Sequence, residues 1–242
     1  MRPVSKGTSP VNGDFADYED AKPYLLSRLG PFCSYCERRI ATNLAVEHIQ
    51  PKGLPQYAAL ERRWANFLLG CVNCNSTKGD KDVPLDQYYL PDRDDTFAAF
   101  DYLPDGTVHP KPGDQIGKDT LALTGLDKSI RQTLDENGKQ VAMDRVADRM
   151  AVWGLALEVK AELDAGSVTR ESVIRNAVSC GFFSVWMKVF EGDTAMRQLL
   201  IHGFDARHGY RGFPGTAKDC FDAQTLPVSP RPANDLPGCG KI

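Results

Sequence analysis

Cys33-Ser34-Tyr35-Cys36 and Cys71-Val72-Asn73-Cys74 are the two stretches of sequence that decide the fold of this chain. A pair of cysteines at this spacing can turn two thiolates toward one ion, and two such pairs complete the tetrahedral site that Zn²⁺ prefers. Four protein ligands leave no open position on the metal, so we predict a structural zinc that takes no part in chemistry. The alternative is a group of four buried cysteines that binds no metal.

Val46-Glu47-His48-Ile49-Gln50-Pro51-Lys52 lies between the two pairs, and Asn75 follows the last cysteine directly. A neutral imidazole is a suitable general base for water near neutral pH. Carboxylate and amide oxygens are hard ligands that suit Mg²⁺ or Mn²⁺ better than Zn²⁺. Neighbouring side chains on a strand point to opposite faces, so Glu47 and His48 reach one site only where the strand end curves. The pattern favours metal-assisted hydrolysis.

The composition indicates a globular chain that works in a reducing compartment. The 242 residues are 42% hydrophobic and 25% charged, without an apolar run long enough to span a bilayer. The first residues, 1–7, lack the apolar stretch of a secretory signal, so we expect a cytoplasmic protein. Thiols stay reduced there, which favours metal binding over disulfides. The three remaining cysteines are expected to be structural or incidental: Cys180, Cys220 and Cys239.

Positive charge is concentrated around the two cysteine pairs. Residues 28–82 hold eight basic and five acidic side chains, a balance of +3 in a chain of net charge −3. The rest of the chain therefore carries −6. An ordinary solvated surface is one explanation of this excess. The other is an anionic partner such as nucleic acid, which would meet the basic segment of an acidic protein.

The first half of the chain shows short elements separated by strong breakers. A short helix is expected late in residues 14–29, strands over residues 44–48 and 66–70, and a helix over residues 73–81. Residues 83–125 are rich in Pro, Gly and Asp and predict an irregular segment with a hairpin near Asp105-Gly106. The acidic run at residues 92–95 could bind a second metal, but a solvated loop is the preferred interpretation.

The second half turns helical. Helices are expected over residues 138–163, 172–180 (capped by Ser167 or Thr169), 182–190 and 194–200. Val146, Met150, Trp153 and Leu157 form an apolar stripe that suits a core or a partner-facing surface. Prolines from residue 214 onward predict an extended tail. The chain therefore divides into an N-terminal segment (1–30), a central core (31–82), a connecting region (83–137), a helical region (138–204) and a tail (205–242).

Together these motifs resemble the HNH endonucleases, which have the ββα-metal fold. The resemblance rests on the cysteine pairs, on Glu47-His48-Ile49 with Pro51-Lys52, on the run from Trp64 to Leu68, and on Cys74-Asn75 with Lys78-Gly79. Within that family the chain is most similar to the small HNH proteins of retron and Septu anti-phage systems, which the opening Met1-Arg2-Pro3 also resembles. The implied fold is α+β and mostly helical, with a zinc-stapled ββα-metal core at residues 31–82 and a C-terminal helical region.

The resemblance also implies roles for individual residues. His48 would be the general base, and Glu47 and Asn75 would hold a catalytic Mg²⁺ or Mn²⁺. Asn66 would be the middle asparagine, which braces the loop and orients His48 without binding metal. Two lysines, Lys52 and Lys78, would contact phosphate. The structural Zn²⁺ would be held by four cysteines: Cys33, Cys36, Cys71 and Cys74. The family often has histidine at the position of Asn75 and aspartate at that of Glu47, but both variants supply an oxygen ligand.

The resemblance implies a metal-dependent endonuclease, with DNA as the expected nucleic acid and a defence complex with an ATPase partner subunit as the expected setting. The chain itself has no GxxxxGK[ST] phosphate loop. The alternative is a zinc-knuckle module that binds nucleic acid or protein without cutting it. That reading explains the cysteines but gives no reason for Glu47, His48, Asn66 and Asn75 to occur in this order. A zinc hydrolase is weaker still, because four thiolates leave the zinc no open position.

Overall fold

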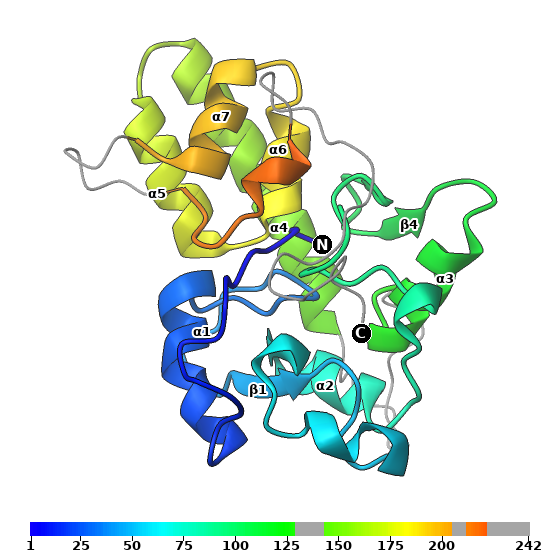
Figure 1. The fold of residues 1–242 in the computed structure, drawn as a ribbon. Coiled ribbons are helices and arrows are strands. Elements are labelled where there is room, and N and C mark those ends of the chain that lie inside the picture. Colours follow the sequence, from blue (N-terminus) through cyan, green and yellow to red (C-terminus); the bar gives the residue numbers. More distant parts are fainter. Residues whose placement is uncertain (129–142, 205–211, 222–242) are drawn as a thin grey trace.

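The computed structural model describes residues 1–128, 143–204 and 212–221 of the chain (Figure 1). Within them the fold is α+β, with two small antiparallel sheets among helices. The predicted core and the long helical region lie side by side and share buried residues in one hydrophobic cluster. None of the described helices is both long enough and apolar enough to cross a membrane. Val141, Cys239 and the tail beyond residue 221 lie outside the described residues.

The core has the predicted ββα order. Strand β1 (Ala45–His48) pairs antiparallel with β2 (Phe67–Gly70), in a register that places His48 opposite Phe67. Helix α2 (Val72–Lys78) follows β2 after one residue, because Cys71 is its N-cap and accepts a hydrogen bond from the Cys74 amide. Gly79 ends α2 with a φ of 52°, a conformation that glycine adopts without steric cost. The last cysteine pair therefore sits at the start of α2.

The N-terminal segment packs against this core. The 3₁₀ helix η1 (Tyr18–Ala21) runs into α1 (Lys22–Leu29), and α1 buries Leu25 and Leu29 toward β2. Lys6, whose side chain is buried, donates hydrogen bonds to the carbonyls of Ala65 and Phe67 at distances of 3.0 and 2.7 Å. The start of β2 is therefore held from outside the ββα unit.

The connecting region contains more regular structure than the sequence predicts. The expected hairpin is present as β3 (Phe100–Tyr102) and β4 (Val108–Pro110), with Gly106 in the turn. Helix α3 (Gln115–Thr124) then lies beside α2 and was not predicted. Its N-cap, Asp114, accepts a hydrogen bond from the Gly117 amide, so one of the aspartates that suggested an irregular segment instead starts a helix.

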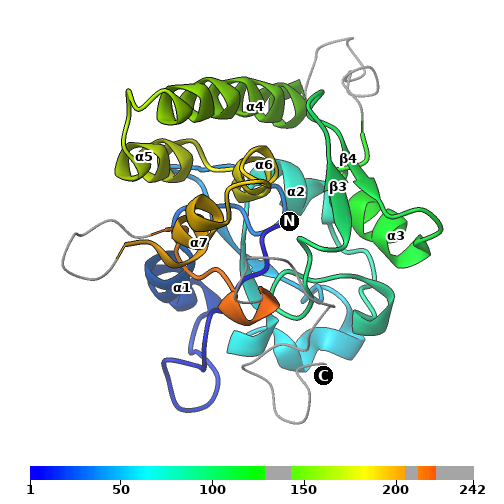
Figure 2. The ribbon, with the colours of Figure 1, turned by 90° about the horizontal axis from the view of Figure 1, so that it is seen from above.

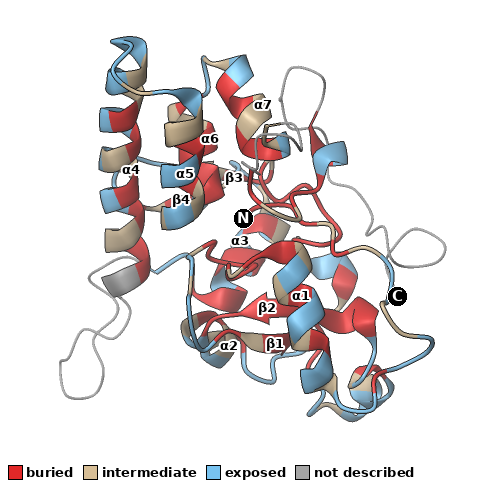
Figure 3. Ribbon diagram, turned by 90° about the vertical axis from the view of Figure 1, so that its left-hand side faces the viewer, coloured by how far each residue is buried: buried red, intermediate tan, exposed pale blue. Residues whose placement is uncertain are grey.

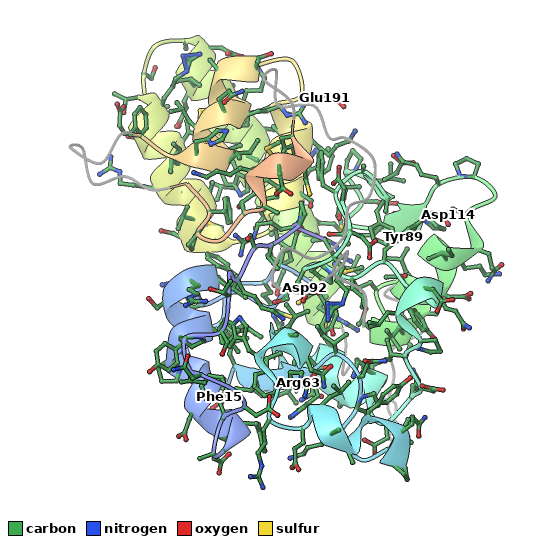
Figure 4. All side chains as sticks on the ribbon, viewed as in Figure 1. Phe15, Arg63, Tyr89, Asp92, Asp114 and Glu191 are labelled. Carbon is green, nitrogen blue, oxygen red and sulfur yellow. The ribbon has the colours of Figure 1, made fainter. Side chains whose placement is uncertain are left out.

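The acidic run at residues 92–95 is not a solvated loop, and that prediction is wrong. Asp92 and Asp95 are 2% and 0% exposed, and Figure 4 shows Asp92 in the interior of the molecule. Asp92 pairs with Lys6 at 2.8 Å and with Arg93 at 3.4 Å. Asp92 is buried together with two cations that neutralise it, its sequence neighbour Arg93 and the distant Lys6, and the local sequence does not reveal the second of these.

The helical region comprises α4 (Met143–Asp164), α5 (Arg170–Cys180), α6 (Phe183–Val189) and α7 (Thr194–His202). Thr169 caps α5 by accepting a hydrogen bond from the Ser172 amide, as predicted. Helix α4 runs along one edge of the molecule (Figures 2 and 3). It buries Val152, Ala156 and Val159 against its neighbours.

The predicted apolar stripe divides between core and surface: Val146 is buried, whereas Met150 and Leu157 are 43% and 51% exposed. One further expectation is corrected in this half. The chain after residue 214 is not simply an extended tail. Thr216 forms a β-bridge with Val4, and Phe213 and Phe221 pack on Phe183.

Candidate active site and metal centre

The two cysteine pairs come together in one buried cluster. The sulfur atoms of Cys33, Cys36, Cys71 and Cys74 all lie within 4.8 Å of one another, and those of Cys36 and Cys71 are 3.8 Å apart. Four ligands at the usual Zn–S distance of about 2.3 Å form a tetrahedron with edges of about 3.8 Å. The donor set and its spacing therefore fit a zinc ion with four thiolate ligands, as predicted.

The surroundings of the cluster suit thiolates. The backbone amide of Cys71 donates a hydrogen bond to the Cys33 sulfur at 3.4 Å. Arg145 of α4, 3% exposed, donates to the Cys74 sulfur at 3.4 Å and to the carbonyl of Thr124 at 2.7 Å. Neighbouring sulfurs lower the pKa of Cys71 far below its usual range, whereas burial and the other sulfurs raise the pKa values of Cys33 and Cys74. Donors of this kind orient metal ligands and stabilise their negative charge.

A pocket of about 210 Å³ lies over β1 and α2, on the side away from α4 (Figure 1). Its lining combines Tyr18 of η1 with five residues that the sequence pattern singles out: Glu47, His48, Lys52, Asn75 and Lys78. All four residues of β1 line this pocket, so Glu47 and His48 both border it although they are consecutive on the strand.

His48 is placed as a base with a defined tautomer. Its Nε2 lies 2.8 Å from the backbone carbonyl oxygen of Glu61. A carbonyl only accepts hydrogen bonds, so Nε2 carries the proton and Nδ1 keeps its lone pair. The ring lies between those of Tyr18 and Phe67, with centroid distances of 4.9 and 5.2 Å. Burial lowers the pKa of His48 from 6.5, although the Glu61 carbonyl opposes the change. The imidazole is therefore neutral at neutral pH.

Glu47 and Lys78 form a buried ion pair beside the base. Glu47 Oε1 lies 3.0 Å from the ammonium of Lys78, and the two residues are 1% and 2% exposed. Lys78 also donates to the carbonyl oxygen of His48 at 2.7 Å. Burial raises the pKa of Glu47, and Lys78 opposes this rise. Lys78 thus favours the ionised carboxylate that a metal ligand must be.

This position differs from the phosphate contact expected for Lys78. Its ammonium already pairs with Glu47 and donates a hydrogen bond to the β1 backbone, and its side chain is almost fully buried. Lys52 lies differently: its side chain is 39% exposed, 3.6 Å from Glu61 Oε1, and its ammonium stands 3.8 Å from the centre of the Tyr18 ring. Of the two lysines, only Lys52 presents its charge at the pocket mouth.

Asn75 lies on the first turns of α2, partly exposed, and lines the pocket with Glu47. In the described parts of the chain its side-chain amide makes no hydrogen bond. Glu47 Oε1 likewise has an ion-pair partner but no hydrogen bond there. A carboxylate and an amide oxygen with spare acceptor capacity in one pocket fit a hard cation such as Mg²⁺ or Mn²⁺.

Asn66 lies behind the pocket and does not line it. Its Oδ1 accepts a hydrogen bond from the Gln50 amide at 2.8 Å, and its Nδ2 donates to the carbonyls of Gln50 and Leu60. The side chain is 0% exposed. These bonds hold the loop that follows His48, which is the bracing that the resemblance implies for this residue.

Sequence reasoning missed three residues that shape the site: Lys6, Tyr18 and Arg145. Lys6 holds the β2 backbone, Tyr18 touches the base, and Arg145 supports a zinc ligand. All three lie outside the motif, and no spacing rule links them to it. Only Arg145 had a signal in the sequence, because it is a basic residue directly before Val146 of the apolar stripe.

Comparison with known proteins agrees with this geometry. No curated protein matches the chain. Residues 33–81 match the family model described as HNH endonuclease, and this range covers the cysteine cluster, β1, β2 and α2. At residues 33–81 the chain is therefore similar to the HNH endonucleases.

Proposed function

We propose that this protein is a metal-dependent endonuclease that hydrolyses phosphodiester bonds, with DNA as its substrate. The observation that carries the proposal is the meeting of His48, Glu47 and Asn75 on one pocket, with the Lys52 ammonium at its mouth. Zinc-knuckle binding alone would need none of these side chains there. The family match at residues 33–81 supports the same reaction class.

In this mechanism His48 Nδ1 takes a proton from a water molecule, which then attacks phosphorus in line with the departing 3′ oxygen. Nε2 stays hydrogen-bonded to Glu61, so the imidazolium that forms is stabilised by that carbonyl. The ion held by Glu47 and Asn75 would stabilise the charge that develops on the phosphate and on the departing oxygen. Lys52 contacts a neighbouring phosphate. The products are a 5′ phosphate and a 3′ hydroxyl.

A plasmid-nicking assay with Mg²⁺ or Mn²⁺ tests the proposal. His48→Ala should reduce the rate by about 10²- to 10⁴-fold, the usual contribution of a general base, while plasmid affinity changes little because phosphate contacts dominate binding. His109→Ala is the matched control, since His109 lies on β4 at the surface. If His48→Ala cuts as fast as the wild-type protein, this site does not carry the reaction. A single-stranded DNA and an RNA of the same sequence give the substrate preference.

We also propose that the nuclease is the effector subunit of an anti-phage defence system and acts with an ATPase partner. The support for this setting is the resemblance of residues 46–79 and of Met1-Arg2-Pro3 to the small HNH proteins of such systems. The test is to identify the neighbouring gene and, where it encodes an ATPase, to co-express the two proteins. Co-purification, and nicking that changes when ATP is added, are the expected results; a neighbouring gene of another class would contradict the setting and leave the nuclease proposal intact.

A further inference from the structure

We propose that Tyr18, which lies outside the residues that match the HNH family, is a positioning residue of the nuclease site. Its ring holds both the His48 imidazole and the Lys52 ammonium in place at the pocket. The inference rests on the proposed function, because it concerns how the proposed base and the proposed phosphate contact are held.

The first contact is with the base. The Tyr18 and His48 rings meet edge to face, with centroids 4.9 Å apart and an interplanar angle of 65°. Phe67 on β2 meets the imidazole at 5.2 Å and 88°. Phe67 belongs to the ββα unit, whereas Tyr18 supplies the second aromatic wall from another segment. With the Glu61 carbonyl fixing the rotation of the ring, these two walls leave Nδ1 one direction in which to point.

The second contact is with the cation. The Lys52 ammonium stands 3.8 Å from the centre of the Tyr18 ring, well within the range of a cation–π interaction. Its other partner is the exposed carboxylate of Glu61, at 3.6 Å. Exposed ion pairs restrain a lysine weakly. The aromatic face is therefore what keeps this long, flexible side chain beside the pocket.

The backbone around Tyr18 is built to hold the ring still. The carboxylate of Asp17 accepts a hydrogen bond from the Glu19 amide at 2.9 Å and so starts η1 at Tyr18. Helix α1 follows without a break, and its buried Leu25 and Leu29 anchor the segment in the core. A ring on a segment anchored in this way keeps its own position and can therefore fix the positions of the His48 and Lys52 side chains.

The ring is the part of this segment that acts. Among the described residues the Tyr18 hydroxyl has no hydrogen-bond partner, so the phenol oxygen contributes no contact. The neighbours Asp17, Glu19 and Asp20 are exposed and acidic, and they repel a phosphate backbone. The segment therefore serves the site through its contacts with His48 and Lys52, and not by binding substrate.

Steady-state nicking kinetics of Tyr18→Ala and Tyr18→Phe test the proposal, with Tyr24→Ala as the control. Tyr24 is 43% exposed on α1 and lines a neighbouring pocket with Phe15. Tyr18→Ala should lower kcat by about ten- to hundredfold through misplacement of the base. It should also raise KM by about two- to fivefold through loss of the cation–π contact. Tyr18→Phe keeps the ring and should restore both parameters, and Tyr24→Ala should match the wild-type protein.

The Lys52→Ala background separates the two contacts. There, Tyr18→Ala should still lower kcat but should no longer raise KM, because the cation that the ring held is gone. Three results would overturn the inference: Tyr18→Ala cutting like wild type, Tyr18→Phe failing as badly as Tyr18→Ala, or a change in KM alone. The last would make the ring a substrate contact.

A nuclear magnetic resonance measurement keeps this test apart from the nuclease proposal. The chain has four histidines, and His48→Gln identifies the His48 ring resonances. In the folded protein, Tyr18→Ala should remove the ring-current shift on His48, while Tyr18→Phe and Tyr24→Ala keep it. If wild type cuts nothing, the proposed function fails, yet this shift still shows whether Tyr18 holds the imidazole. Unchanged His48 resonances in Tyr18→Ala would refute the positioning role directly.

Discussion

At the scale of single residues, the environment of His48 sets the pH range of the reaction. Burial against Tyr18 and Phe67 disfavours the charged ring, so the pKa of His48 lies below 6.5. A base with a lowered pKa remains neutral, and so able to accept a proton, down to a lower pH. The unfolded chain binds this proton more readily than the folded chain, so the same change makes stability fall as the pH drops below about 6.5.

The first prediction is therefore a single-turnover nicking rate whose acid limb has its midpoint below pH 6.5. Rates measured between about pH 5 and pH 8 at saturating metal give the midpoint of the acid limb. The residual activity of His48→Ala should lack this limb. A midpoint above 6.5 would show that the imidazole is not desolvated as the structure has it.

The buried pair of Glu47 and Lys78 makes the second prediction. Lys78→Met leaves a buried carboxylate without its partner and should lower the free energy of unfolding by about 3–5 kcal/mol. The double variant Glu47→Gln with Lys78→Met should recover part of this loss, because no charge is left unpaired. Urea unfolding in the presence of zinc measures both. Lys160→Met is the control, since its partner Asp164 is 61% exposed and such pairs contribute about 0–1 kcal/mol.

At the scale of elements, the loop between β1 and β2 depends on Asn66. Asn66→Ala removes three hydrogen bonds inside the protein and leaves both backbone groups of Gln50 without this partner. We predict a loss of at least about 2 kcal/mol in unfolding free energy. Asn66→Asp keeps the acceptor for the Gln50 amide and should lose less. Equal stability of wild type and Asn66→Ala would contradict the bracing role.

The nicking rate of a folded Asn66 variant tests whether this loop affects His48. Asn66 does not line the pocket, so any fall in rate has to pass through the loop to His48. Asn73→Ala, at a partly exposed position of α2, is the matched control and should change stability by less than about 0.5 kcal/mol.

Elements whose signals are local were predictable from the sequence. The strands β1 and β2, helix α2 and the Thr169 cap carry their alternation, cysteine spacing or capping residue within a few positions. Helix α3 was missed because a run of Asp, Gly and Pro before it resembles a loop, although Asp114 is a helix cap. The burial of Asp92 was missed because one of its two cation partners, Lys6, is far away in the sequence.

The residues of the candidate site also divide into those with a local sequence signal and those without one. The residues proposed to perform the chemistry belong to one motif and could be named from it. The side chains that hold these residues in place come from other segments: Tyr18 from η1, Lys6 from the N-terminal segment and Arg145 from α4. Only the folded chain brings them to the motif, and neither composition nor periodicity indicates which partner each one will meet.

At the scale of the whole molecule, the zinc cluster connects the core to the helical region. Arg145 joins the Cys74 sulfur to the carbonyls of Thr124 and Gly125, so α2, α3 and α4 share one donor. The Glu37 carboxylate accepts hydrogen bonds from the amide and hydroxyl of Ser184 at the start of α6. Loss of the metal would therefore loosen contacts well beyond the cysteine loops.

The last prediction concerns zinc retention. Arg145→Met should weaken zinc binding by about 10- to 100-fold, because it removes a donor to a ligand. Competition with a chromogenic chelator measures the change. Arg170→Met, which removes a surface pair with Asp193, is the control and should release zinc like the wild-type protein. Equal zinc release from the Arg145 and Arg170 variants would exclude Arg145 as a support of the cluster.

The hydrogen bonds that cross into the ββα core also bear on whether it can be transplanted. Residues 33–81 receive Lys6 at the backbone of β2, Arg145 at a cysteine sulfur and Ser184 at Glu37. Cut out and grafted into another protein, this segment would expose a carboxylate and carbonyls that now have buried partners. The ββα core is therefore not an interchangeable cassette: a graft would have to carry the N-terminal segment that holds Lys6, α4 and the start of α6 with it.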